Sequence, residues 1–107
     1  MAKKYEMNMV ITNGVITKLV PTVAEQVKTK ILPNYIFMLH RNESDPKTWT
    51  ISEFGSGRAV CAGLPTRQAA IDKLNKVLES RSDDLVRIVK SFIEKDGYIN
   101  EIWKEVK

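Results

Sequence analysis

His40 and Cys61 are the single histidine and the single cysteine of the chain, so they limit the catalytic and metal-binding chemistry that the sequence can support. His40 ends the apolar run Tyr35–His40 on the same side as Ile36 and Met38, which is more typical of a packed or hydrogen-bonded histidine than of a general base or ligand. Cys61 lies within an expected strand, where a small buried apolar side chain is favoured over a reactive thiol. One cysteine excludes an intramolecular disulfide and disfavours a thiolate zinc site.

Two further motifs resemble catalytic or phosphate-binding features but fit structural roles better. Asp83 and Asp84 are adjacent, so on a helix they point in different directions, whereas both carboxylates are stabilising at a helix start. Gly55-Ser56-Gly57 joins two expected strands, whereas a phosphate-binding loop opens a helix. We therefore predict that the protein is not an enzyme and that it has no catalytic residues, metal site or cofactor.

Basic side chains near the expected turns are the signal for a nucleic-acid partner. The candidates are Arg41, Lys47, Arg58, Arg67, Lys73 and Lys76. If the sheet edges and the start of the following helix share a side, the first four would form a rim of positive charge that attracts phosphates without reading sequence. The alternative is that they are ordinary solvated charges. The formal net charge of +4 is compatible with either interpretation.

Apolar side chains are the signal for a protein partner. The run Tyr35–His40 is apolar on both sides, which is typical of a central strand with both faces covered. The segment Tyr98–Val106 has apolar residues three and four apart, but it is too short to form a stable helix alone and must dock on this domain or on a second chain. If all helices cover one face of the sheet, the other face favours a dimer or a partner. The candidate interface residues are Ile36, Met38, Ile99, Ile102 and Trp103.

The elements that position these residues follow from hydrophobic period and turn signals. A hairpin over 4–20 turns at Asn13-Gly14, and a capping box at Thr22–Glu25 predicts a short helix from Val23 to Ile31. A core of three strands and a helix spans 35–79, with Thr66 as the helix cap, and further helices span 83–106. The predicted order is ββαβββααα: one α+β domain over 1–107, an antiparallel sheet with helices packed on it.

Two families resemble parts of this pattern. The predicted order helix, three strands, helix from Val23 to Glu79 resembles a double-stranded-RNA-binding domain, and the run Gly63–Ala70 resembles the entry to that family's second helix. Arg67 matches a basic position there, while Gln68 and Ile71 stand where lysines would be expected. The same stretch also resembles antitoxins of the HicB type, although it lacks their Pro-Gly turn. Both resemblances imply a nucleic-acid-binding module.

The composition and motifs together predict a small, non-catalytic binding or regulatory module that acts through protein–protein association with a partner protein or as a homodimer. Nucleic-acid binding is the alternative function. No apolar run approaches the roughly 20 residues of a membrane span, and the N-terminus does not resemble a secretory signal. We therefore expect no membrane association and a cytoplasmic location. The small size suits an accessory protein of the kind carried by phages or mobile elements.

Overall fold

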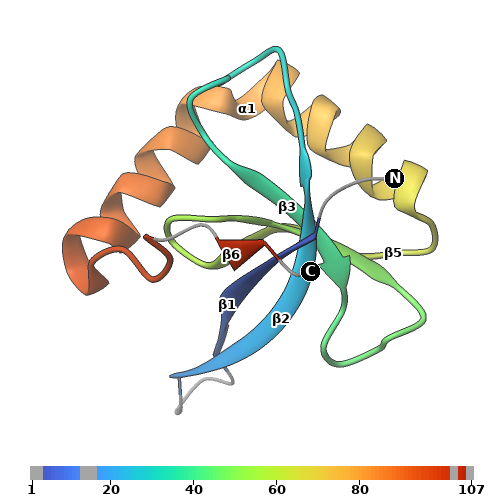
Figure 1. Ribbon diagram of the computed structural model, residues 1–107. Helices are drawn as coiled ribbons and strands as arrows, with labels where there is room; N and C mark the ends of the chain where they lie inside the picture. Colours follow the sequence, from blue (N-terminus) through green and yellow to red (C-terminus); the bar gives the residue numbers. More distant parts are fainter. Residues whose placement is uncertain (1–3, 13–16, 102–103, 106–107) are drawn as a thin grey trace.

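The structure, a computed structural model, combines one antiparallel sheet with one long helix, an α+β arrangement (Figure 1). It describes residues 4–12, 17–101 and 104–105. The elements are β1 (Lys4–Thr12), β2 (Thr17–Val27), β3 (Phe37–Arg41), β4 (Trp49–Glu53), β5 (Arg58–Leu64), α1 (Arg67–Asp96) and the two-residue β6 (Lys104–Glu105). Within the described residues the strand order across the sheet is β5-β4-β3-β2-β1-β6.

The predicted N-terminal hairpin is confirmed by the register of β1 and β2. Thr12 pairs with Thr17 and Lys4 pairs with Glu25, so the two strands are antiparallel neighbours along the whole length of β1. The Asn13-Gly14 turn itself lies outside the described residues. Met7 and Met9 are buried, as the two-residue alternation of β1 predicts. The hairpin is therefore longer than predicted, because β2 continues well beyond residue 20.

The predicted helix from Val23 to Ile31 is wrong, because Val23–Val27 is the second half of β2. The capping-box residues Thr22 and Glu25 instead pair with β1, and Glu25 also lies opposite Leu39 of β3. Valine and threonine favour the pleated conformation, so pairing on both sides outweighs a local helix signal. Without this helix, the order of a double-stranded-RNA-binding domain is not present in Val23–Glu79.

The face of the sheet that α1 covers contains the largest apolar cluster. Phe37, Leu39 and Ile51 on the sheet pack against Ala70, Leu74 and Leu78 in the first half of α1, and all six are at most 2% exposed. Helix α1 begins as predicted, because the Thr66 hydroxyl accepts a hydrogen bond from the Ala69 amide at 3.0 Å. The prediction that Tyr35–His40 contains a central strand is confirmed, since β3 lies between β2 and β4.

The opposite face is covered by the chain itself, because the sheet curls until β1 meets the turn between β4 and β5. The Val10 amide donates to the Gly57 carbonyl at 2.8 Å, which joins the two distant parts of the sheet. Met38, fully buried, packs there with Met7, Ala24 and Phe54. The face that we expected to remain uncovered without a partner is therefore enclosed around Met38.

The described part of the C-terminal third contains one helix rather than the three predicted, and the order of elements in the described residues is βββββαβ, without the predicted helix after the N-terminal hairpin. Residues 67–96 form a single helix with non-helical angles at Arg81 (φ −139°), which bends it over the sheet (Figure 1). Gly97, at φ 76°, ends α1 in a conformation that glycine adopts at little cost. Residues 98–101 are not helical, and Lys104–Glu105 pairs with Tyr5 and Glu6 of β1.

Candidate binding cleft

The predicted basic rim is divided between two ends of the sheet. At one end the guanidinium groups of Arg41 and Arg67 lie 3.9 Å and 5.5 Å from the centre of the Trp49 indole ring. Arg67 is also paired with the buried carboxylate of Glu25. The charge of Arg67 is therefore paired within the protein, and the exposed Arg41 guanidinium lies over an aromatic ring.

Arg58 lies at the other end of β5, about 20 Å from Leu64, the last residue of the strand, by the rise per residue of a strand. Its guanidinium is 3.2 Å from the Asp96 carboxylate and 4.1 Å from the centre of the Phe92 ring. Lys47 is exposed in the loop before β4, and Lys73 and Lys76 are exposed on the first half of α1. The structure does not bring the six basic residues into one patch.

The candidate interface residues are distributed differently. Ile36 lines the larger of two adjoining clefts and Ile99 lines the smaller one. Met38 is buried inside the protein and cannot contact a partner without rearrangement. Ile102 and Trp103 lie outside the described residues. Two of the five candidates therefore mark a concave surface that the sequence did not reveal.

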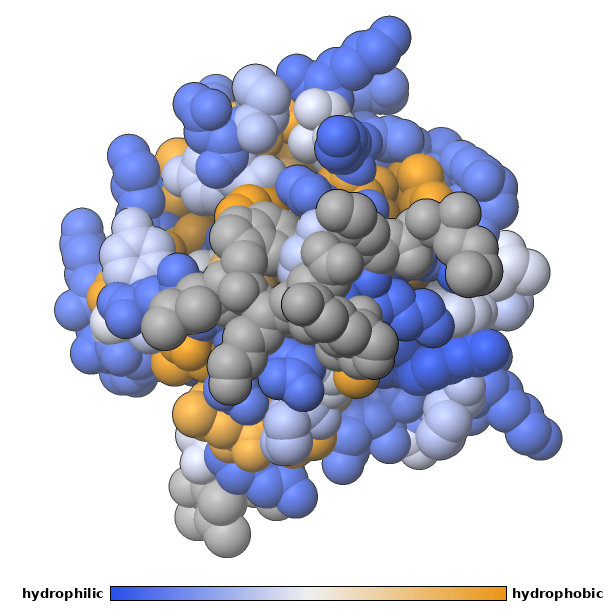
Figure 2. Space-filling model, viewed as in Figure 1, coloured by the Kyte–Doolittle hydropathy of each residue, from blue (hydrophilic) through white to orange (hydrophobic). Residues whose placement is uncertain are grey.

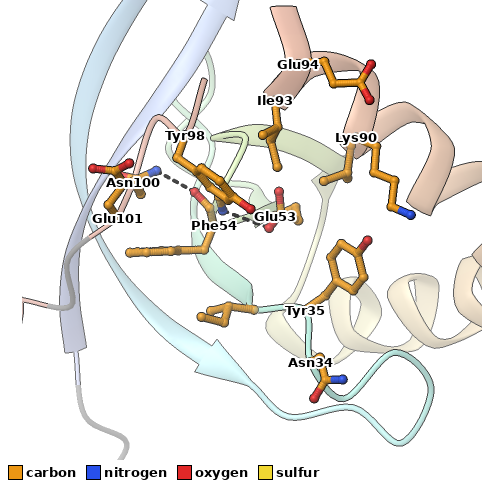
Figure 3. A pocket seen from close by; sticks show the side chains of 13 residues that line it. Asn34, Tyr35, Glu53, Phe54, Lys90, Ile93, Glu94, Tyr98, Asn100 and Glu101 are labelled. Atoms are coloured by element: carbon orange, nitrogen blue, oxygen red, sulfur yellow. Dashed lines mark hydrogen bonds between the residues drawn. The ribbon is translucent and has the colours of Figure 1, made fainter. Parts of the chain in front are cut away.

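The larger cleft lies between the second half of α1, the end of β4 and the segment after α1, and has a volume of about 840 Å³ (Figure 3). The first half of α1 packs on the sheet. The helix then bends at Arg81, and its second half forms one side of the cleft. The lining residues are Asn34, Tyr35, Ile36, Glu53, Phe54, Gly55, Val89, Lys90, Ile93, Glu94, Tyr98, Asn100 and Glu101.

Glu53 lies at the base of the cleft and is 4% exposed. Its Oε2 accepts a hydrogen bond from the Gly55 amide and its Oε1 accepts one from the Ser56 amide, both at 2.8 Å. The Glu53 backbone carbonyl also accepts from Gly57, which closes the turn into β5. The carboxylate is thus held in one orientation by rigid backbone.

Tyr98 forms one wall of the cleft beside Glu53 and is 60% exposed. A Cβ atom at Gly55 would lie 3.2 Å from the Tyr98 ring and 3.2 Å from Glu53 Oε2. The glycine therefore lets the ring and the carboxylate approach one another across the turn. The Ile99 amide donates to the Gly55 carbonyl at 2.8 Å, which fixes the backbone next to Tyr98.

Asn100 anchors the wall that separates the two clefts. Its side-chain amide donates to the carbonyls of Asn8 at 2.9 Å and Phe54 at 2.8 Å, and its side-chain oxygen accepts from the Asn8 amide at 2.7 Å. The smaller cleft, on the other side of Asn100 and Glu101, is bordered by β1 and β2. The segment after α1 is thereby attached to both sides of the curled sheet.

His40 and Ser52 form a hydrogen-bonded pair inside the sheet, which sequence reasoning did not detect. His40 Nδ1 is 2.9 Å from the Arg41 carbonyl, which can only accept, so Nδ1 carries the proton and Nε2 accepts from the Ser52 hydroxyl at 2.8 Å. Such a pair resembles a nucleophile with its base. However, His40 and Ser52 are 2% and 1% exposed and line neither cleft, so substrate has no access. Burial lowers the pKa of His40.

Cys61 has the environment of a structural cysteine. It belongs to the cluster beneath α1, and its thiol is 3.7 Å from the Ala70 carbonyl. Burial raises the pKa of the thiol, which disfavours the nucleophilic thiolate. No group of three or more potential metal ligands occurs within residues 4–12, 17–101 and 104–105.

Comparison of the chain with known protein families, characterised proteins and solved structures gives no significant match. In the described part of the chain, no helix is both long and apolar enough to cross a bilayer. The cleft therefore has to be interpreted from its own residues.

Sequence reasoning missed Glu53, Tyr35 and Tyr98. The one available signal was a charged residue at the end of a strand, directly before Phe54 and Gly55.

Proposed function

We propose that the protein is a non-catalytic binding module that holds a segment of a partner protein in the larger cleft. The observation that carries this proposal is the composition of an open cleft of about 840 Å³. Its walls combine aromatic and branched apolar side chains from three separate parts of the chain, with a fixed carboxylate at the base. Concave apolar surfaces with a few oriented polar groups are typical of binding sites.

The exposed side chains at the cleft support a protein partner. Tyr98 is 60% exposed and Tyr35 and Ile93 are half-buried, so a partner could remove a large apolar area from water. Tyrosine is enriched at protein interfaces because it offers apolar area and a polar tip at a low entropy cost. On the face drawn in Figure 2, apolar residues form separate patches among hydrophilic ones.

The cleft is also preorganised, which favours binding over a purely structural gap. Three hydrogen bonds fix its borders: the Gly55 amide donates to Glu53 Oε2, the Ile99 amide donates to the Gly55 carbonyl, and the Asn100 side chain donates to the Phe54 carbonyl. A site that is rigid before binding loses less conformational entropy when it is occupied.

Nucleic-acid binding has weaker support from the geometry. Arg41 and Arg67 share Trp49 at one end of β5, while Arg58 pairs with Asp96 at the other. Glu53, Glu94 and Glu101 in the cleft would repel phosphates. The basic residues would therefore have to act as separate sites.

The test is site-specific photo-crosslinking in the source cell. A benzophenone amino acid at Ile93 should form an adduct with a defined protein, and Tyr98→Ala should reduce the yield at least fivefold while the melting temperature stays within a few degrees. The matched control is the same photoprobe at Lys73, which is exposed on the first half of α1. Equal adducts from both positions, or adducts that disappear after nuclease treatment, would contradict the proposal.

A further inference from the structure

The charge of the larger cleft is opposite to that of the whole chain. Three carboxylates line it, from Glu53, Glu94 and Glu101, against one ammonium group, from Lys90, while the chain has a formal net charge of +4. Glu94 and Glu101 are exposed and Glu53 is buried at the base. A positively charged group would therefore be attracted into this cleft and guided toward its base.

Glu53 has unused capacity to bind a cation. Both of its oxygens accept one backbone N–H each, and each carboxylate oxygen can accept a second hydrogen bond. Among the described residues, no Lys or Arg lies within ion-pair distance of Glu53. Glu25, the other buried glutamate on the sheet, does have such a partner in Arg67. A buried carboxylate is stabilised most when a cation also contacts it.

Aromatic rings flank the carboxylate. The Tyr98 ring and Glu53 Oε2 both border the position that a Cβ atom of Gly55 would occupy, and in Figure 3 the carboxylate lies between the rings of Tyr98 and Tyr35. Ring faces attract cations, most strongly when the site is partly removed from water. Aromatic rings beside a fixed carboxylate suit a flat guanidinium or a compact ammonium group at the end of an apolar stem.

We infer that the larger cleft recognises an arginine or lysine side chain in the partner segment, with the charged end bound by Glu53 and the stem between Tyr35 and Tyr98. This inference rests on the proposed function and specifies the chemistry of the partner. Ile93 on α1 then contacts apolar residues of the same segment, and Glu94 and Glu101 increase the rate of encounter.

The test follows backbone amide resonances while a small probe is titrated into the full-length protein. The probe is N-acetyl-arginine N-methylamide, and the matched control is the citrulline analogue, which has nearly the same shape without the charge. The amides of Gly55 and Ser56 donate directly to Glu53, so they report on any new contact with its carboxylate. We expect saturable shifts of these two amides with the arginine probe, and affinity at least tenfold weaker with the citrulline probe.

Variants separate the cleft from nonspecific charge effects. Tyr98→Leu should weaken the affinity for the arginine probe at least threefold, and Glu53→Gln should abolish the saturable shifts. Because Glu53→Gln also disturbs the turn, the exposed pair Glu94→Gln and Glu101→Gln provides a second test and should weaken binding about twofold with the fold unchanged. Asp84→Asn, on exposed α1 surface, is the control with no expected effect.

Equal responses to both probes, or arginine shifts that Tyr98→Leu and the double glutamine variant leave unchanged, would overturn the inference. The proposed function has a separate readout, because crosslinking at Ile93 does not depend on the charge of the partner. A specific adduct whose crosslinked peptide contains no Lys or Arg near the attachment point would support the proposed binding function but contradict the recognition of a cation.

Discussion

The side chain of Asn100 pairs with the backbone of Asn8 as a neighbouring strand would, accepting from its amide at 2.7 Å and donating to its carbonyl at 2.9 Å. The partner of Asn8 on the other side is Pro21, which has no N–H to donate. Asn8 therefore directs both backbone groups toward the outer edge of β1, where Asn100 satisfies them. The flanking positions are also covered, since Glu6 pairs with β6 and Val10 bonds to Gly57. These contacts protect an edge strand from pairing with other chains.

Replacement of Asn100 should be costly because three polar contacts, one buried and two partly buried, depend on one side chain. Asn100→Ala leaves the Asn8 amide and the carbonyls of Asn8 and Phe54 without these partners, which should lower the free energy of unfolding by about 2–4 kcal/mol. Urea denaturation measures the loss. Asn75→Ala, at an exposed position of α1, is the control and should change stability by less than about 0.5 kcal/mol. Similar values for the two variants would show that Asn100 does not hold the segment after α1.

Protonation of His40 should destabilise the fold in mild acid. Burial lowers the pKa of His40 in the folded state, so below the ordinary value near 6.5 the unfolded chain binds a proton more readily than the folded one. Stability that is fully present above that pH is then lost as the pH falls, by at most about 1.4 kcal/mol per pH unit for this one group. The measurement is the urea midpoint between pH 7.5 and 5.

His40→Gln is the control for this pH dependence, because glutamine can still accept from Ser52 but does not titrate. We expect the wild-type protein to lose more stability than the variant over the same pH range. Parallel pH profiles would contradict the assignment of the effect to His40, whatever the absolute stabilities of the two proteins.

Two glycines with similar backbone angles should respond differently to alanine. Gly57 (φ 66°) and Gly63 (φ 74°) both have left-handed angles, but a Cβ at Gly57 would lie 2.9 Å from the Asn8 carbonyl oxygen, whereas at Gly63 nothing lies within 4 Å. Gly63→Ala should cost about 1 kcal/mol for backbone strain alone, and Gly57→Ala about 2–4 kcal/mol because the curled sheet must also open. Thermal or urea unfolding compares them. Equal costs would indicate that β1 does not approach the β4–β5 turn closely.

Local signals in the sequence predicted those elements whose stabilising contacts are themselves local. Alternation of apolar and polar residues and the Asn-Gly turn identified the hairpin, and Thr66 marked the start of α1 one turn before its partner Ala69. The apolar run Tyr35–His40 identified the central strand because both faces of a buried strand are covered.

Elements determined by distant contacts could not be predicted in this way. The helix signal at Thr22–Glu25 is overridden by pairing with β1 and β3. The spacing that suggested a helix after Tyr98 is overridden by bonds from Asn100 to a residue 92 positions earlier. The candidate site depends on the same kind of contact, because Glu53 and Tyr98 meet across Gly55 only after the segment following α1 returns to the sheet.

The pair formed by Arg67 and Glu25 links the start of α1 to the strand that replaced the predicted helix. Glu25 is 7% exposed, so removal of the Arg67 charge leaves a buried carboxylate without its cation. Arg67→Gln should therefore lower stability by about 1–3 kcal/mol in urea denaturation. Arg41→Gln is the matched control, because Arg41 contacts the same Trp49 ring but forms no ion pair in the described part of the chain, so its loss should cost less than about 1 kcal/mol.

Addition of Glu25→Gln to Arg67→Gln decides whether the loss arises from the unpaired charge. If it does, the double variant should recover part of the stability that Arg67→Gln loses, because no buried carboxylate then remains uncompensated. Purely additive losses would instead show that the Arg67 guanidinium acts mainly through its contact with Trp49. In that case the ion pair would not explain why Val23–Val27 remains in β2. Pairing with β1 and β3 alone would then have to outweigh the local helix signal of this segment.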